Sequence, residues 1–189
     1  MLKLNVVVVS TRPERVGLAV GEWFHRRAVA HGRFEVVFVD LHELALPLLD
    51  EPEHPKLRKY TKRHTHAWSK SVESADAFTF VTPEYNFGMP PTLLNAIDFV
   101  YVEWNYKAAS FVSYGGVSGG LRSTQMAKLP LTTVKVMPIV EQVAIPFVTK
   151  QIAGGTFTPT DAQDKSAATM LDELHRWATA LKPMRDETR

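Results

Sequence analysis

Three turns of this sequence carry the residue types that could bind a ligand, and the first of them is Ser10–Gly17. It combines two hydroxyls with Arg12 and Arg15 just before a helical pattern. A helix N-terminus offers free backbone N–H groups and the positive end of the helix dipole, and arginine pairs bidentately with phosphate. We favour a phosphate site over a polar loop with solvated arginines. The turn lacks the glycine pattern of a dinucleotide site and the Gly-Lys-Ser/Thr of a Walker loop, so a monophosphate fits better than a pyrophosphate.

The second turn, Thr82–Pro91, gathers aromatic rings, one carboxylate, one side-chain amide and three prolines in a short stretch. A planar heteroaromatic ligand needs such a mixture, because it has apolar faces and a polar edge. The alternative is a surface loop in which Tyr85 and Phe87 pack onto the core.

The third turn, Ser113–Gly120, holds four glycines. Glycine permits positive φ angles and a close approach of the backbone to a ligand. A tight turn explains one or two of these glycines. The others indicate backbone contact with something flat.

Short apolar runs alternate with helical patterns along the chain, which is typical of a parallel sheet with crossover helices. Strands are expected at Leu4–Ser10, Phe34–Val39, Ala77–Val81, Ser110–Ser113, and either Val134–Val136 or Val143–Ile145. Helices are expected from Val16 to a stop at Gly32, and at Leu57–Ser74, Pro91–Phe99 and Leu121–Leu131. A last helix should have Thr160 as its N-cap and an apolar stripe that runs to Leu181, before Pro183. We predict one α/β domain over residues 1–189, with a doubly wound five-stranded parallel sheet and helices on both faces.

The three turns follow the first, third and fourth predicted strands. Ligands of doubly wound sheets bind beyond the carboxyl ends of the strands, so the turns should meet at one site.

Composition narrows the chemistry. The 189 residues carry a formal net charge of +2 and no cysteine. Disulfides, thiolate metal sites, cysteine nucleophiles and an obligatory iron–sulfur cluster are therefore excluded, and no metal motif is present. The near-neutral charge gives no case for nucleic acid, and neither a signal peptide nor a membrane span is recognisable. We expect a cytoplasmic protein.

One resemblance sharpens this reading. The stretch Ser74-Ala75-Asp76-Ala77-Phe78, then Thr82-Pro83-Glu84-Tyr85-Asn86, Pro90 and Leu94-Asn95-Ala96-Ile97-Asp98 closely resembles the NADPH-dependent FMN reductase family. That family includes azo, quinone and chromate reductases with a flavodoxin-like fold. Ser10-Thr11-Arg12-Pro13 with Arg15 resembles its phosphate turn, and Gly115-Gly116 with Gly119-Gly120-Leu121-Arg122 resembles its third loop.

The resemblance implies a cofactor-binding set. Ser10, Arg12, Arg15 and the Val16 amide would hold the FMN phosphate. The isoalloxazine ring would be lined by Pro83, Glu84, Tyr85 and Asn86, and by Ser113, Tyr114, Gly115 and Gly116. Two departures stand out: Val9 replaces a common glycine, and Gly88 replaces a common serine beside the acceptor pocket.

It also implies an activity. The chain would transfer hydride from NADPH or NADH to FMN and pass electrons to a small acceptor, by a ping-pong mechanism. The acceptor would be a quinone, an azo compound, free flavin or a metal oxyanion. The flavin carries the chemistry, so no catalytic side chain is expected. The alternatives are a flavodoxin-type electron carrier and a non-catalytic FMN-binding module. A homodimer or homotetramer is expected, without nucleic acid or membrane partners.

Some remaining signals receive structural interpretations. Trp23, Phe24, Phe78 and Trp177 lie on apolar stripes and should be core. Tyr101, Trp104 and Tyr106 could form a subunit interface beside the flavin. For the basic run Lys56–His64 we favour a solvated helix face or a subunit contact over nucleic-acid binding.

Overall fold

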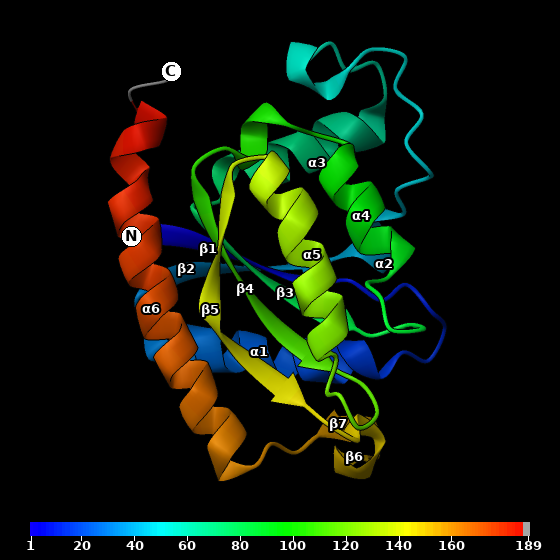
Figure 1. The fold of residues 1–189 in the computed structure, drawn as a ribbon, viewed down its shortest axis with the longest axis vertical. Coiled ribbons are helices and arrows are strands. Elements are labelled where there is room, and N and C mark those ends of the chain that lie inside the picture. Colours follow the sequence, from blue (N-terminus) through cyan, green and yellow to red (C-terminus); the bar gives the residue numbers. More distant parts are fainter. Residues whose placement is uncertain (187–189) are drawn as a thin grey trace.

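In the computed structural model, which describes residues 1–186, five parallel strands form a sheet of order β2-β1-β3-β4-β5 (Figure 1). The strands are β1 Leu2–Val8, β2 Phe34–Asp40, β3 Ala77–Pro83, β4 Lys107–Tyr114 and β5 Val136–Ile145. Every residue of β3 and β4 is buried, which is typical of central strands covered on both faces. The predicted doubly wound sheet is confirmed.

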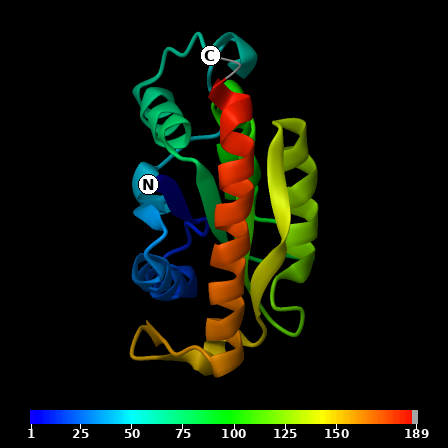
Figure 2. The same cartoon turned by 90° about the vertical axis from the view of Figure 1, so that its left-hand side faces the viewer.

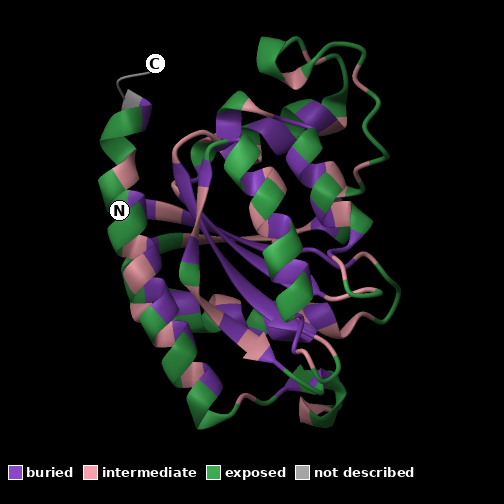
Figure 3. Cartoon of the chain, in the orientation of Figure 1, coloured by how far each residue is buried: buried purple, intermediate pink, exposed green. Residues whose placement is uncertain are grey.

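Helices cover both faces of the sheet. On one face, α1 (Val16–His31) and α6 (Asp161–Asp186) pack against a core cluster that includes Val6, Val112 and Ile145. On the other, α3 (Arg63–Ser74), α4 (Pro91–Asp98) and α5 (Leu121–Thr133) enclose a second cluster around Trp68 and Trp104. Figure 2 shows α6 running along the whole length of the molecule. Figure 3 shows the buried strands between helices whose outer faces are exposed.

Short elements complete the chain. The helix α2 (Leu41–Leu44) follows β2 directly, and 3-10 turns cover Pro55–Leu57, Val102–Trp104 and Val148–Gln151. A small antiparallel hairpin, β6 (Ile152–Ala153) with β7 (Thr156–Phe157), precedes α6. None of the helices described is long and apolar enough to cross a bilayer.

Two predicted helix ends are confirmed by their capping geometry. Gly32 has a φ of +77° and donates to the carbonyl of Val29, as expected of a residue that ends a helix. At the start of α6, the Thr160 hydroxyl accepts from the Gln163 amide at 3.3 Å, and the Thr160 amide donates to the Gln163 side chain at 2.8 Å. This reciprocal pair is a capping box.

The predicted helix Leu57–Ser74 is wrong over its first part, because α3 begins only at Arg63. The Tyr60 hydroxyl donates to the buried carboxylate of Glu103 at 3.0 Å. The amides of Thr61 and Lys62 donate to Glu51 at 2.8 and 2.9 Å. These contacts with distant residues hold the chain in a non-helical path.

Two further predictions change. The fifth strand, β5, contains the predicted Val143–Ile145 but only the last residue of the alternative, Val134–Val136, and its register shifts opposite Ala109–Phe111. The last helix continues past Pro183 to Asp186, and its final turn is fixed where Arg185 pairs with Asp76 and donates to the Tyr106 carbonyl. Trp23, Phe24 and Phe78 are buried as predicted. Trp177 is 38% exposed, so its prediction as core is wrong: it stands at the edge of the apolar stripe of α6.

Candidate functional site

The three turns singled out in the sequence leave the carboxyl ends of β1, β3 and β4, which are neighbours in the sheet. A hydrogen bond of 2.9 Å joins the hydroxyls of Ser10 in the first turn and Tyr85 in the second. The Arg12 guanidinium stands 5.9 Å from the centre of the Tyr85 ring. The structure therefore brings the first two turns into contact.

The first turn offers unused hydrogen-bond donors. The amides of residues 11, 12 and 14–17 find no acceptor among the residues described. Arg12 is exposed, whereas Arg15 is ion-paired with Asp40 at the end of β2. The Arg15 Nε is buried and has no partner within the described chain. Free amides, an exposed guanidinium and an unsatisfied buried N–H together form a cradle for an anion.

The second turn is a tight hairpin. The Tyr85 amide donates to the Gly88 carbonyl at 3.0 Å, and the Gly88 amide donates back at 2.9 Å. Between them Asn86 and Phe87 take φ angles of +50° and +66°, an arrangement of the type I′ turn. Both side chains are exposed at the corner of the hairpin.

Glu84 connects the second turn to the third. Its carboxylate accepts from the Ser118 hydroxyl at 2.9 Å, from the Arg122 amide at 3.0 Å and from the Arg122 guanidinium at 2.6 Å. Burial would raise the pKa of Glu84, but these hydrogen bonds outweigh it and hold the pKa below its usual value. The Arg122 guanidinium also lies 4.2 Å from the centre of the exposed Phe87 ring. Glu84, a residue of intermediate burial, thus acts as an ionic clamp between two loops.

The glycines of the third turn divide into two kinds. Gly119 and Gly120 have φ angles of +60° and +85°, and a Cβ at Gly120 would meet the Tyr114 amide at 2.7 Å. They are explained by the turn that leads into α5. A Cβ at Gly116 would meet nothing within 4 Å, and Gly116 has no positive φ. Of these three glycines, Gly116 is therefore the one that faces open space, and neither its φ angle nor its packing requires a glycine.

Two predicted site residues have their side chains turned into the protein. The Ser113 hydroxyl is buried and donates to the Gly119 carbonyl at 2.8 Å. Tyr114 is 4% exposed, and burial raises the pKa of its hydroxyl, which contacts Ser10. Ser113 can reach a ligand through its backbone alone, while Tyr114 supports Ser10.

Sequence reasoning missed several residues of the site. Asp40 is an acidic residue at the carboxyl end of β2, the neighbour of β1, and this position could have marked it as part of the site. Its partner Arg15 is 25 positions away, so the pairing could not be predicted. The His42 ring contacts the Thr11 carbonyl at 3.1 Å. Ser118 in the third turn and Arg122 just after it are the partners of Glu84. Nothing in their residue types or spacing marks them as such.

The prediction of an aromatic interface residue is wrong for Trp104. Trp104 is fully buried, 4.8 Å from Phe78 and 5.8 Å from Trp68 between ring centres. The segment that contains Tyr101 and Tyr106 precedes β4, so it lies at the amino ends of the strands, opposite the three turns.

The basic run Lys56–His64 lies outside the site, and two of its basic side chains contact acidic neighbours. Arg58 pairs with Glu73 and Glu103, and His64 contacts Asp50 at 2.8 Å. Tyr60 is bonded to Glu103. These contacts attach the segment that precedes α3 to the rest of the protein. Within the run, Lys56 and Leu57 belong to a 3-10 turn and only Arg63 and His64 belong to α3.

Comparisons with known proteins agree with the fold and the turns. A family model described as NADPH-dependent FMN reductase matches residues 2–150. An NAD(P)H-dependent FMN reductase of Schizosaccharomyces pombe is 39% identical over 126 residues, which cover 66% of this chain and 63% of that protein. An NAD(P)H:quinone oxidoreductase of Solanum tuberosum is 47% identical over 60 residues, 30% of this chain and 31% of that protein.

Among solved structures, the flavoenzyme NAD(P)H:(acceptor) oxidoreductase of Paracoccus denitrificans has a TM-score of 0.74 at 22% identity, with 95% of this chain and 98% of that chain covered. This likeness confirms the flavodoxin-like fold. The family match covers the sheet and all three turns. The description of the family and the names of the relatives give the enzyme class and the cofactors that the sequence predicted, FMN with NADPH or NADH. The chain belongs to the NADPH-dependent FMN reductase family, a family of flavin-dependent oxidoreductases.

Proposed function

We propose that this chain binds FMN across the three turns and uses it to carry hydride from NADPH or NADH to a small acceptor. The observation that carries the proposal is the meeting of the turns. Ser10 bonds to Tyr85, and Glu84 bonds to Ser118 and Arg122, at the carboxyl end of the sheet and within the residues that the family model matches.

The residues of the first turn fit a phosphate. Ser10, Arg12, Arg15 and the Val16 amide would hold it, together with the other free amides of residues 11–17. The unsatisfied Nε of Arg15 supports this assignment, because a buried donor without an acceptor is costly and a phosphate oxygen would satisfy it. The Asp40 carboxylate keeps the Arg15 guanidinium in place.

The second and third turns fit a planar ring. Pro83, Tyr85 and Asn86 would line one side, with Glu84 as the clamp that fixes their loop. On the other side the backbone of Ser113–Gly116 would approach the ring, and Gly116 leaves the open space for it. The Tyr114 hydroxyl, which contacts Ser10, would keep the Ser10 hydroxyl in position.

When bound, FMN supplies the chemistry, since it accepts hydride and passes electrons on. The residues of the chain would bind FMN, orient it and polarise its ring. The amides of Asn86 and Gly116 donate to no described acceptor, so they are free to stabilise negative charge at the edge of the ring, as an oxyanion hole does. No side chain of the turns is assigned as an acid or base.

The nucleotide and the acceptor would use the same space in turn, which is a ping-pong scheme. The name of the Solanum tuberosum relative supports a quinone as acceptor, and azo compounds, free flavin and metal oxyanions are the other candidates. A Cβ at Gly88 would lie 3.2 Å from the Met126 sulfur. Glycine here lets the Met126 side chain pack closely against the hairpin.

We further propose that residues 1–189 act as one FMN-binding domain in the cytoplasm, as a homodimer or homotetramer. Exposed apolar side chains on α4 and α5, namely Leu94, Leu121, Met126 and Leu129, support the oligomer, because a second copy would remove them from water. Light scattering of the purified protein measures the number of subunits.

The decisive experiment is the absorbance spectrum of the purified chain with FMN, before and after addition of NADPH under anaerobic conditions. The expected result is a bound flavin that NADPH bleaches and a quinone restores. Arg12→Ala should weaken FMN binding about tenfold, the loss of one charge-assisted contact. Protein that refuses FMN under titration would overturn the proposal, and flavin that binds without bleaching would reduce it to a binding module.

A further inference from the structure

A cavity lies at the opposite end of the sheet from the three turns. It has a volume of about 960 Å³ and is bounded by residues before β3, β4 and β5, by the C-terminal part of α3 and by the last turns of α6. The strand β3 has seven residues, so this end lies roughly 20 Å from the turns. A ligand here would not touch the proposed FMN site.

The lining of this cavity is strongly cationic. Six basic side chains face three carboxylates, which leaves a surplus of three positive charges; the basic residues are Arg58, Lys70, Lys107, Lys135, Lys182 and Arg185. A concave surface with charges of one sign concentrates counter-ions of the other sign. The cavity therefore favours an anion.

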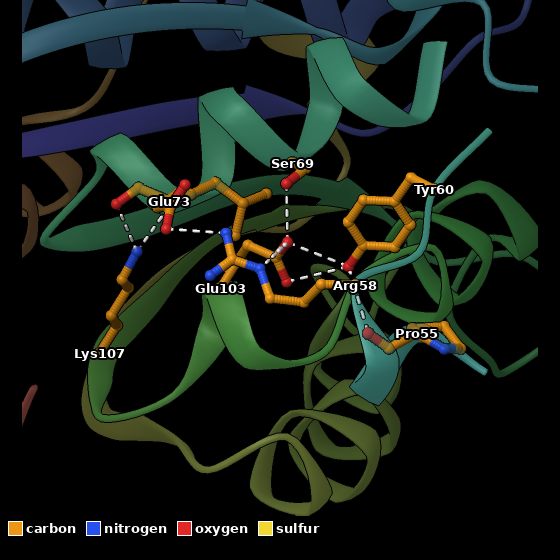
Figure 4. A network of polar contacts seen from close by, with 8 residues as sticks. Pro55, Arg58, Tyr60, Ser69, Glu73, Glu103 and Lys107 are labelled. Atoms are coloured by element: carbon orange, nitrogen blue, oxygen red, sulfur yellow. Dashed lines mark hydrogen bonds and ion pairs between the residues drawn. The ribbon is translucent and has the colours of Figure 1, made fainter. Parts of the chain in front are cut away.

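The three carboxylates are already bonded within the protein. Figure 4 shows the Arg58 guanidinium between Glu73 and Glu103, at 2.8 and 3.4 Å. Glu103 also accepts from the Ser69 hydroxyl at 2.7 Å. Asp76 pairs with Arg185. With these charges matched, the surplus falls on the lysines.

The deepest cations of the cavity are fixed. Lys107 is 2% exposed, and its ammonium donates to the carbonyls of Val72 and Glu73 at 2.6 and 3.0 Å (Figure 4). Arg185 is 7% exposed and donates to the Tyr106 carbonyl at 2.9 Å. A ligand would meet positive charge that is already held in place, so little ordering would be lost on binding.

The outer lysines are available to a ligand. Lys70 on α3 and Lys182 on α6 are exposed, and neither has a carboxylate partner among the side chains described. Lys135, just before β5, donates to the Tyr106 hydroxyl at 3.1 Å. Ammonium groups on three different elements suit a group with several negative oxygens, such as a chain of phosphates.

Asn105 adds a contact of another kind. The residue lines the cavity, and its side-chain oxygen is buried and has no donor among residues 1–186. A buried acceptor without a partner is costly, and a phosphate cannot satisfy it because phosphate oxygens are themselves acceptors. A hydroxyl or amino group on the organic part of the ligand would satisfy it.

We propose that this cavity binds a nucleotide that carries two or more phosphates, with the phosphates on Lys70, Lys135 and Lys182 and a sugar or base donor on Asn105. The proposal does not rest on the FMN site, because the two ends of the sheet share no residue. It gives this reductase a second small-molecule site through which a nucleotide can alter its stability or activity.

Isothermal titration of the full chain, with FMN added in excess to fill the first turn, tests the proposal. The probes are ATP and inorganic tripolyphosphate, without Mg²⁺ and at constant ionic strength. The expected result is saturable binding of both. Lys70→Gln with Lys182→Gln should weaken both about tenfold, whereas Lys128→Gln with Lys165→Gln, which removes the same charge outside the cavity, should change either by less than about twofold.

Asn105→Ala locates the organic part of the ligand. It should weaken ATP binding while tripolyphosphate binds as before. Absence of saturable ATP binding, binding of tripolyphosphate alone, or an equal loss in both lysine pairs would overturn the proposal. A chain that refuses FMN yet binds ATP through Lys70 and Lys182 would refute the proposed function and leave this site standing.

Discussion

The hydroxyl of Tyr114 lies so close to Gly17 that a Cβ at position 17 would stand 2.2 Å from its oxygen and 3.0 Å from Cζ. Tyr114 ends β4 and Gly17 is in the first turn of α1. The contact brings the start of α1, next to the first turn, close to the start of the glycine-rich third turn. Glycine is required here for close approach, since no positive φ is involved.

Gly17→Ala should therefore disturb the site as well as the fold. The Tyr114 ring must shift and pull on Ser10, and overpacking of this kind costs about 2 kcal/mol of the free energy of unfolding. FMN affinity should fall with it. Urea unfolding and fluorescence titration with FMN measure the two effects. Tyr114→Phe in the Gly17→Ala background removes the nearest atom and should recover part of the stability. A variant as stable as the parent would contradict this contact.

Asp40→Asn should uncover the Arg15 charge. Both side chains are at most 10% exposed, and removing one partner of a buried ion pair costs about 3–5 kcal/mol. Asparagine still accepts the His42 amide bond, so the start of α2 is kept. If the FMN phosphate lies near Arg15, it supplies the missing negative charge, so FMN should raise the melting temperature of the variant more than that of the parent.

Thermal melts with and without FMN measure this difference. Glu35→Gln, which removes one partner of the exposed Lys3–Glu35 pair, is the matched control and should change stability by less than about 1 kcal/mol. An equal FMN-induced shift in Asp40→Asn and the parent would place the phosphate away from Arg15.

Glu84→Gln tests the clamp between the second and third turns through its pH dependence. The folded pKa of Glu84 lies below the ordinary value of 4.5, so its stabilisation is present above about pH 4.5 and is lost as the pH falls through the folded pKa. At pH 7 the variant should lose about 2 kcal/mol, the worth of hydrogen bonds to a charged group. The gap between variant and parent should narrow in acid. Urea unfolding at several pH values measures it, and a gap independent of pH would show that Glu84 does not act through its charge.

The sheet was predictable because each strand is an apolar run bounded by turn residues, and a parallel sheet then places the three turns at one edge. The pairings that complete the site were not. Arg15 with Asp40, and Glu84 with Arg122, join residues 25 and 38 positions apart, and no local pattern marks such partners.

Local patterns also misled where tertiary contacts dominate. Tyr60 reaches the buried Glu103 and holds back the start of α3. The aromatic residues from Tyr101 to Tyr106 suggested an interface by their type, yet Trp104 fills the core because it follows α4 on the covered face of the sheet. In both cases the deciding contact is distant in the sequence.

Two glycines of the third turn allow a residue that contacts the ligand to be distinguished from one that the fold requires. Gly116→Ala adds a methyl group into open space at an ordinary φ, so the free energy of unfolding should stay within about 0.5 kcal/mol of the parent. If the flavin ring approaches this backbone, the same methyl group should weaken FMN binding about tenfold or more. Gly120→Ala should instead destabilise the fold, because its φ is +85° and its Cβ would strike the Tyr114 amide. Paired urea unfolding and FMN titration of the two variants distinguish these effects. Undiminished FMN affinity in a stable Gly116→Ala would mean that the ring does not contact the third turn at this position.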